Sequence, residues 1–261
     1  MGGRAGGRGG NALSCRFVQS PMGTFRTPLI AREQVAEGTM AFRFARPAGF
    51  EFTAGQSINL GLVDPPETDG KGNRRTFSLV SAPFEGELVV ATRIRDTAFK
   101  RVLKALPAGT EVELRGPAGK FTLDPSETAP AVLLAGGIGV TPFVSILRQA
   151  AGEKLARRLV LFYSNRRPED AAFLDELDGL QARNPNYRFI GTMTGMEKSA
   201  RSWRGEVGFI DQAMLGRYIG DLSRAACYLA GPPAMVEAMK KILAGVGLKE
   251  ESLRSDEFYG Y

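Results

Sequence analysis

Hydrophobic and polar positions alternate over short stretches in the first half of the chain, which indicates half-buried β-strands. Turn residues such as Pro47-Ala48-Gly49 and a polar loop at 64–73 separate these stretches. One helix is expected inside the series, at 98–106, before the turn Pro107-Ala108-Gly109. Short strands divided by turns are typical of a small antiparallel β-barrel. The six expected strands cover 25–34, 40–46, 57–63, 75–80, 87–95 and 110–115.

In the second half, short and fully apolar runs alternate with segments of helical spacing. The expected strands cover 131–135, 159–163, 188–192 and 226–229, and the expected helices cover 142–151, 168–182, 211–218 and 233–246. This alternation predicts a parallel sheet with helices on both faces. We therefore predict two domains, an N-terminal antiparallel β-barrel at 14–125 and a C-terminal α/β parallel-sheet nucleotide-binding domain at 126–261. A Gly/Arg-rich tail at 1–13 precedes them.

Composition excludes several classes of protein. The 261 residues include two cysteines, Cys15 and Cys227, and no histidine. An iron–sulfur cluster needs more thiolate or histidine ligands than these, so the chain cannot hold one. We expect no metal site, because the commonest metal ligand is missing. No apolar run has the length of a membrane span, and the N-terminus lacks the apolar core of a secretory signal, so we expect a cytoplasmic protein.

The net charge is +6, of which Arg4 and Arg8 in the tail supply two, leaving +4 on the rest of the chain. A mildly basic surface favours an acidic partner or a phosphate-rich ligand, although a solvated surface explains the same charge. We interpret the tail as disordered. The alternative is an RNA-binding Gly/Arg arm with salt-sensitive binding, and we do not expect a nucleic-acid partner.

A glycine-rich turn is the strongest local signal of the second half. The segment 134–142 (LAGGIGVTP) follows the first apolar strand and opens a helix. Glycines let the backbone approach a diphosphate, and a helix N-terminus offers unpaired N–H groups. Pro142 suits the first helical turn. Many α/β proteins tighten such a turn without binding a ligand, so both interpretations stay open.

Five motifs in one order make the sequence resemble the ferredoxin–NADP reductase superfamily, from about Thr27 to Tyr261. The motifs are FTAGQ at 52–56, RTFS at 75–78, GPAGKF at 116–121, GGIGVTP at 136–142 and AGPPAM at 230–235. The second resembles the family's Arg-x-Tyr-Ser flavin motif, with Phe77 in the aromatic position. Taken alone, Arg74-Arg75-Thr76-Phe77-Ser78 is an edge strand with two basic residues.

The resemblance implies that the chain binds FAD and takes hydride from NADPH or NADH. Arg75 would pair with the FAD diphosphate through its guanidinium fork. Phe77 would pack beside the isoalloxazine or the ribityl chain, and Ser78 would donate a hydrogen bond near flavin N5. Residues 92–94 would contact FAD through backbone groups or are ordinary strand residues, and the 97–98 N–H groups would cap the diphosphate. The implied FAD-binding residues are Arg75, Thr76, Phe77, Ser78, Thr92, Arg93, Ile94, Thr97 and Ala98.

The resemblance also implies the nicotinamide-binding residues. They are Gly136, Gly137, Ile138, Gly139, Thr141, Pro142, Ser164, Arg166, Gly231, Pro232 and Met235. An acid after the second strand would bind the ribose hydroxyl of NADH, whereas Ser164 and Arg166 could hold a 2′-phosphate, which mildly favours NADPH. A C-terminal aromatic, Phe258 or Tyr261, would cover the second face of the flavin; a C-terminal strand with a frayed aromatic tip is the alternative. Ser78 and Phe258 are therefore the candidate catalytic residues.

Two departures from the family pattern matter. Ala230 stands where the family often has a cysteine that positions nicotinamide. The ferredoxin-type cluster domain of many oxygenase reductases is missing, so electrons must leave to another protein or a free acceptor. We expect a ferredoxin or flavodoxin-like carrier. The alternatives are a reductase component of an oxygenase, a reductase of free acceptors such as quinones or ferric complexes, and a non-catalytic flavin-binding subunit, which Ala230 keeps open.

Overall fold

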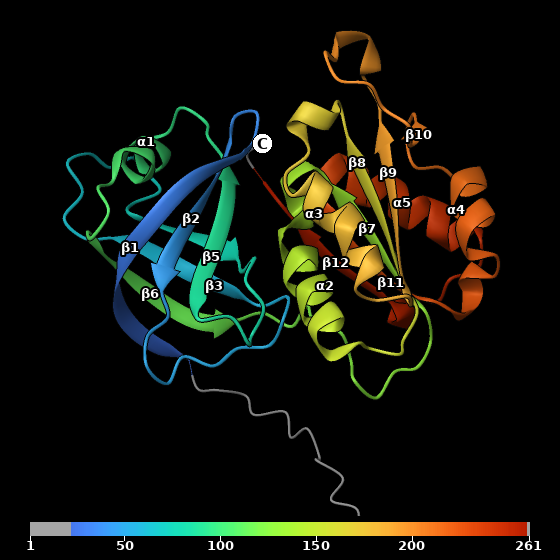
Figure 1. Cartoon of the computed structure of the whole chain (residues 1–261), viewed down its shortest axis with the longest axis horizontal. Coiled ribbons are helices and arrows are strands. Elements are labelled where there is room, and N and C mark those ends of the chain that lie inside the picture. The colour runs from blue at the N-terminus through green and yellow to red at the C-terminus, as the bar shows by residue number, and fades with distance from the viewer. Residues whose placement is uncertain (1–21, 260–261) are drawn as a thin grey trace, which may run out of the picture.

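The computed structural model describes residues 22–259, and two six-stranded sheets lie side by side in it (Figure 1). The strands of the first sheet are β1 (Gly23–Ala36), β2 (Thr39–Ala45), β3 (Ser57–Leu62), β4 (Arg74–Ser78), β5 (Glu87–Arg93) and β6 (Glu111–Ala118). They pair antiparallel in the order β4-β3-β6-β1-β2-β5. A bridge between Leu79 and Val90 joins the chain after β4 to β5, so the two outer strands meet. The expected antiparallel barrel is thereby confirmed.

The second sheet is parallel, with the order β10-β9-β8-β7-β11-β12. Its strands are β7 (Ala131–Gly136), β8 (Leu159–Asn165), β9 (Tyr187–Met193), β10 (Glu206–Val207), β11 (Ala226–Gly231) and β12 (Leu253–Glu257). Its helices are α2 (Thr141–Glu153), α3 (Leu174–Gly179), α4 (Gln212–Ile219) and α5 (Pro233–Gly245). The first two pack on one face and the last two on the other, which confirms the expected α/β domain. The strand order reverses between β7 and β11, and such a reversal opens a crevice at the carboxyl ends of the strands.

α1 (Ala98–Ala105) lies on the side of the barrel away from the parallel sheet (Figure 1). Phe99 and Leu103 on this helix are buried in the core of the barrel, together with Phe42 and Leu60 from the strands. Thr97 caps the helix, because its side-chain oxygen accepts from the N–H of Lys100. The sequence prediction of this helix is confirmed within one residue at its end.

The single helix expected at 168–182 is wrong. The chain instead forms a short turn (Pro168–Asp170), then α3, and then another short turn (Leu180–Ala182). Phe173 has a left-handed backbone with φ of 59°, which interrupts any continuous helix. The hydroxyl of Tyr163 on β8 donates to the carbonyl of Ala172 at 3.2 Å, so a tertiary contact binds backbone that the periodic pattern assigned to the helix.

Polar contacts join the two halves on both sides of their boundary. The Ser145 hydroxyl on α2 donates to the carbonyl of Ser81 at 2.6 Å, and both residues are buried. Elsewhere Arg167 pairs with Glu37 in the β1–β2 turn at 2.8 Å. The boundary predicted at 125/126 falls in the connection between β6 and β7 and stays a prediction. Among residues 22–259, no helix combines the length and the apolar character needed to cross a membrane.

Candidate functional site

A cavity of about 620 Å³ lies where the barrel meets the end of the parallel sheet. The barrel contributes Ser57 and Ser78, and β12 with the residues after it contributes the opposite wall. The lining residues are Ser57, Thr76, Ser78, Gly119, Lys120, Phe121, Arg254, Ser255, Asp256, Glu257, Phe258 and Tyr259. Strands β3 and β4 of the barrel, residues 119–121 after β6 and the C-terminal segment 254–259 therefore form one site.

β4 decides which residues of the RTFS motif reach this cavity. Side chains alternate along a strand, so Thr76 and Ser78 share one face and Phe77 takes the other. Thr76 and Ser78 line the cavity. Phe77 is buried in the barrel core, where its ring lies 6.0 Å from that of Phe99. The packing of Phe77 against the flavin ring is therefore not what this cavity offers.

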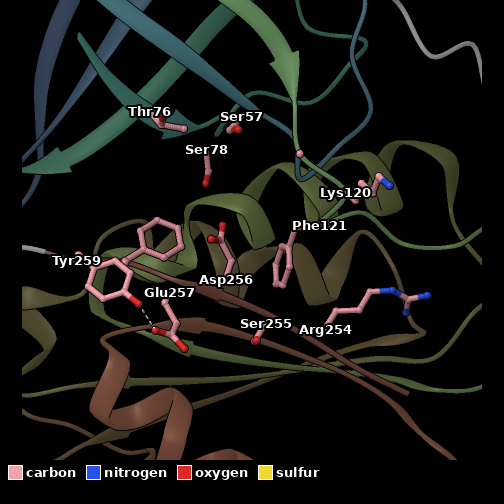
Figure 2. A pocket seen from close by; sticks show the side chains of 12 residues that line it. Ser57, Thr76, Ser78, Lys120, Phe121, Arg254, Ser255, Asp256, Glu257 and Tyr259 are labelled. Atoms are coloured by element: carbon pink, nitrogen blue, oxygen red, sulfur yellow. Dashed lines mark hydrogen bonds between the residues drawn. The ribbon is translucent and has the colours of Figure 1, made fainter. Parts of the chain in front are cut away.

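Asp256 is a cavity residue that the sequence prediction missed. Figure 2 shows its carboxyl group pointing toward the Ser78 hydroxyl from the opposite wall. Burial raises the pKa of this carboxyl above its ordinary value. Asp256 is one of two adjacent acids near the C-terminus, and both line the cavity. The parallel pairing of β12 with β11 sets Asp256 beside Ala230 and Glu257 beside Gly231.

The aromatic residues after β12 also lie at the cavity. Phe258 lines it, and its backbone N–H donates to the carbonyl of Gly231 at 3.0 Å. Tyr259 lines it as well, which the sequence prediction did not anticipate, and its hydroxyl donates to Glu257 at 2.5 Å (Figure 2). Tyr261 lies outside the described residues. The C-terminal strand is therefore present, and the covering of the flavin by Phe258 stays a prediction.

Arg75 points away from the cavity, into the loop before β4. Its Nη2 donates to both carboxylate oxygens of Asp69, at 2.8 and 3.1 Å. Its Nη1 donates to two carbonyls of the loop and to that of Arg74 at the start of β4. Its guanidinium lies 5.0 Å from the centre of the Phe99 ring. These contacts hold the guanidinium in one orientation beside the N-terminus of α1.

Lys100 adds a second cation there. Burial, followed by the positive charges of Arg95 and Arg75, lowers its pKa to about 8. A cation that other cations destabilise marks a place where an anion would be stabilised. Arg101 differs, because Glu67 and Asp96 already pair with it, and Asp69 pairs with Arg75 in the same way. Within residues 22–259, no carboxylate pairs with Lys100, and the diphosphate of FAD fits beside it at the N-terminus of α1, where Arg75 would exchange Asp69 for the phosphate.

Several backbone donors expected to reach FAD are already in use. The N–H of Thr97 donates to the carbonyl of Arg95 at 2.9 Å, and that of Ile94 donates to Gly38 at 2.8 Å. Thr92 is buried, and its hydroxyl donates to the carbonyl of Arg93 at 3.3 Å. Ala98 is the first residue of α1, where a backbone N–H has no partner inside the helix.

The glycine-rich turn lies at the reversal point of the parallel sheet. A side chain at Gly139 would meet the backbone of Ala230 and Gly231, and one at Gly136 would meet Met235 and Pro232. These two glycines therefore let the 136–142 and 230–235 turns pack together. Gly137 differs, because it has φ of +53° and nothing within 4 Å of the position a side chain would take. Of the three glycines, Gly137 leaves its backbone open to a ligand.

The other predicted residues of this turn are buried inside the protein and stabilise the turn. Ile138, Thr141 and Pro142 are buried, and the Thr141 hydroxyl donates to the carbonyl of Ile138 at 3.1 Å. They start α2 directly at the turn.

The end of β8 carries Ser164, half-buried, and Arg166, exposed. Two acids follow within a few residues, and both are engaged. The Glu169 carboxylate accepts from the N–H groups of Ala200 and Arg201 at 2.8 and 3.1 Å. Asp170 pairs with Arg167 at 2.9 Å.

Comparison with known proteins gives a consistent result. A family model described as "Oxidoreductase NAD-binding domain" matches residues 133–241. The reductase component of propane 2-monooxygenase from Rhodococcus jostii is 28% identical over 247 residues, which are 91% of this chain and 64% of that protein. NADH-cytochrome b5 reductase 1 from Cryptococcus neoformans is 30% identical over 246 residues, with 89% of this chain and 82% of that protein covered.

A solved structure of ferredoxin NADP⁺ reductase from Neisseria gonorrhoeae, with bound FAD and NADP, has the same fold. It matches with a TM-score of 0.73 at 21% identity and covers 90% of this chain and 98% of that one. The two-sheet fold, the cavity between its halves and the relative that matches over most of both lengths agree with the five motifs. The chain therefore belongs to the ferredoxin–NADP reductase superfamily of oxidoreductases, which bind FAD and a nicotinamide nucleotide.

Proposed function

We propose that this protein is an NAD(P)H-dependent flavin reductase that passes electrons to a separate acceptor. The observation that carries the proposal is the cavity in which Ser78 faces Asp256 and Phe258. It adjoins the Gly231 turn, since the N–H of Phe258 donates to Gly231. A flavin ring in this cavity would lie next to a nucleotide bound at the reversal point of the sheet. The proximity of two bound cofactors is what hydride transfer requires of the protein.

Arg75 and Lys100 would hold the diphosphate, and Ser78 would hold the reactive end of the flavin. Bound FAD supplies the chemistry of accepting a hydride and releasing electrons. Ser78 is 7% exposed, so water competes little for the hydrogen bond of its hydroxyl group. Asp256, whose pKa is raised by burial, lies on the opposite wall.

Phe258 would cover the flavin until nicotinamide replaces it. Its backbone N–H donates to Gly231, which fixes the main chain beside the 230–235 turn. An aromatic ring at this point excludes water from the reacting atoms. Phe258 thus regulates access, and Ser78 orients the flavin.

The end of β8 favours NADPH over NADH. Glu169 and Asp170 are the acids that follow it, and protein groups already satisfy both carboxylates. Ser164 and Arg166 remain for the nucleotide, and an arginine suits a 2′-phosphate.

The acceptor we propose is a ferredoxin or flavodoxin-like carrier, because a chain of net charge +6 favours association with an acidic protein. The second candidate is a reductase component of an oxygenase. The 28% identity to the propane 2-monooxygenase reductase component favours it. Because the chain spans 64% of that relative's length, the electron partner of the relative does not carry over directly.

The test is anaerobic reduction of the FAD-loaded protein by NADPH or NADH, followed at the flavin absorbance band. We expect rapid bleaching, faster with NADPH. Ser78→Ala should slow it about 10- to 100-fold, near the cost of losing one preorganised donor. Ser202→Ala, at an exposed serine that does not line the cavity, is the matched control and should leave the rate unchanged. Bound flavin that neither nucleotide reduces would instead support a non-catalytic subunit.

A further inference from the structure

A second cavity, of about 700 Å³, borders the later part of the β6–β7 connection. The barrel contributes the loop at 51–54, the connection contributes 123–128, and α2 contributes residues such as Ile146. None of its lining residues lines the cavity that contains Ser78. It is therefore a separate site, and the proposed reductase chemistry does not use it.

The floor of this second cavity is apolar. Its floor residues are Phe52, Ala54, Leu123, Ile146, Ala150 and Leu155. Four of them are buried to 92% or more, although they border a cavity. A concave apolar surface of this size suits the hydrocarbon part of a small molecule.

The wall above this floor is acidic. It carries Glu51, Asp124, Glu127 and Glu153 against the single base Arg157, so its formal charge is −3 (four acids minus one base). The whole chain, by contrast, carries +6. Hydrogen bonds from Ser126 lower the pKa of Asp124, so this carboxyl stays charged at neutral pH. An anion would be repelled here and a cation attracted.

Arg157 does not reverse this preference, because Glu127 pairs with it and two of its nitrogen atoms donate to carbonyls of the connection, although its Nη2 makes no hydrogen bond. Its Nε donates to the carbonyl of Ala129 at 2.6 Å, and its Nη1 donates to that of Asp124 at 3.3 Å. Its Nη2 pairs with Glu127 at 3.1 Å, and the side chain is 5% exposed. Arg157 therefore holds the connection, and within residues 22–259 neither Glu51 nor Glu153 forms an ion pair.

Gln149 on α2 adds a specific polar group. Its Nε2 donates to Glu153, whereas its Oε1 is buried and has no hydrogen-bond partner. A buried acceptor without a donor costs free energy until a donor reaches it. An ammonium group supplies N–H donors and a positive charge together.

We propose that this cavity binds a small amphipathic ammonium compound. Its hydrocarbon chain would lie on the apolar floor, and its ammonium group would donate to Gln149 Oε1 and approach the carboxylates of Glu153 and Glu51. An alcohol of the same length would lose the ionic part of the interaction, and a carboxylate would be repelled. The ligand would also bridge the barrel, the connection and α2.

Isothermal titration calorimetry with n-decylammonium, n-decanol and decanoate, each below its aggregation concentration, tests the proposal. We expect decylammonium to bind at least about tenfold more tightly than decanol and decanoate not to bind, because only the first pairs with the acidic wall. Binding should raise the unfolding temperature with ligand concentration. The titration uses the full chain with and without FAD, so the result does not depend on flavin reduction.

Substitutions localise the binding. Glu51→Gln and Glu153→Gln should each weaken decylammonium binding about fivefold, near the contribution of one exposed ion pair. Ala156→Trp, at an exposed lining position, should abolish it by filling the cavity. Glu250→Gln, an exposed acid elsewhere, is the control. Equal binding of decanol, or unchanged binding in both glutamine variants, would overturn the proposal.

Discussion

Gly139 offers a sharp test of how the two turns of the nucleotide domain fit together. A Cβ atom at this position would lie 2.5 Å from the carbonyl carbon of Ala230 and 2.6 Å from the Cα of Gly231, and it would also overlap the Ala230 oxygen. Ordinary contacts begin at 3.4 Å, so the facing backbone would have to move by about 1 Å. Because β11 and β7 pair directly, that movement would strain the centre of the sheet.

We therefore expect Gly139→Ala to lower the free energy of unfolding by about 3 kcal/mol, the upper end of the usual cost of overpacking, because backbone must shift. For a chain of this size that corresponds to roughly 6–12 °C in the unfolding temperature. Urea unfolding of the nucleotide-free protein, followed by circular dichroism, measures the change.

Gly137→Ala is the matched control. Its Cβ would meet nothing within 4 Å, and the cost is that of a left-handed residue, about 1–2 kcal/mol. This variant should lose nucleotide affinity more than stability, because its methyl group occupies the open side of the turn. The reasoning fails if Gly139→Ala unfolds within about 0.5 kcal/mol of the wild type, the usual range of neutral surface changes.

Three further predictions concern charged and nucleophilic groups. Lys100→Met should stabilise the FAD-free protein below pH 8, because burial and neighbouring cations lower the pKa of Lys100 to about 8. The gain in stability should shrink as the pH rises toward 10.5, where the lysine of the unfolded chain also loses its proton. Urea titrations at pH 7 and pH 10 should therefore show a larger gain at pH 7. Arg75→Ala should weaken FAD binding about 10- to 100-fold in equilibrium dialysis, which is the cost of losing a charge-assisted contact. Arg74→Ala, which removes the partner of Glu113, should leave FAD binding unchanged. Equal losses in the two variants would contradict the role given to Arg75. Cys227 is fully buried, and burial raises its pKa to about 12. In a Cys15→Ser variant it should therefore resist a thiol reagent at pH 8 until the protein unfolds. Labelling of the folded protein would contradict this prediction.

Local patterns fixed most of the secondary structure. The β-strands of the barrel were predicted because apolar side chains alternate along them with polar ones. In β2, for example, Phe42 and Phe44 are fully buried and Arg43 between them is half-buried. The α/β order followed from apolar runs such as β7, which is buried along its whole length. The prediction failed at 168–182, where a hydrogen bond from Tyr163 and the left-handed Phe173 break the helix. Neither feature leaves a periodic signal in the sequence.

The sequence likewise indicated some residues of the candidate site and not others. The motifs pointed to Ser78 and Phe258, and both line the same cavity; their roles toward FAD stay predictions. Asp256 and Tyr259 were missed, because nothing in a short acidic and aromatic C-terminal segment tells which side chain turns inward. The motif also pointed to Phe77 as a contact of the isoalloxazine or the ribityl chain; its side chain is buried in the barrel core, and that role stays a prediction.

The sequence by itself determined the element order, the glycine turn and the absence of histidine, because these depend on residue identity and on spacing between neighbours. Tertiary structure alone decided that Gly139 serves packing while Gly137 stays open, that Asp69 holds Arg75, and that a C-terminal strand carries Asp256 to Ser78. Those outcomes depend on which segments meet in space. A linear pattern records the periodicity of each segment and carries no information about the partner that the segment packs against.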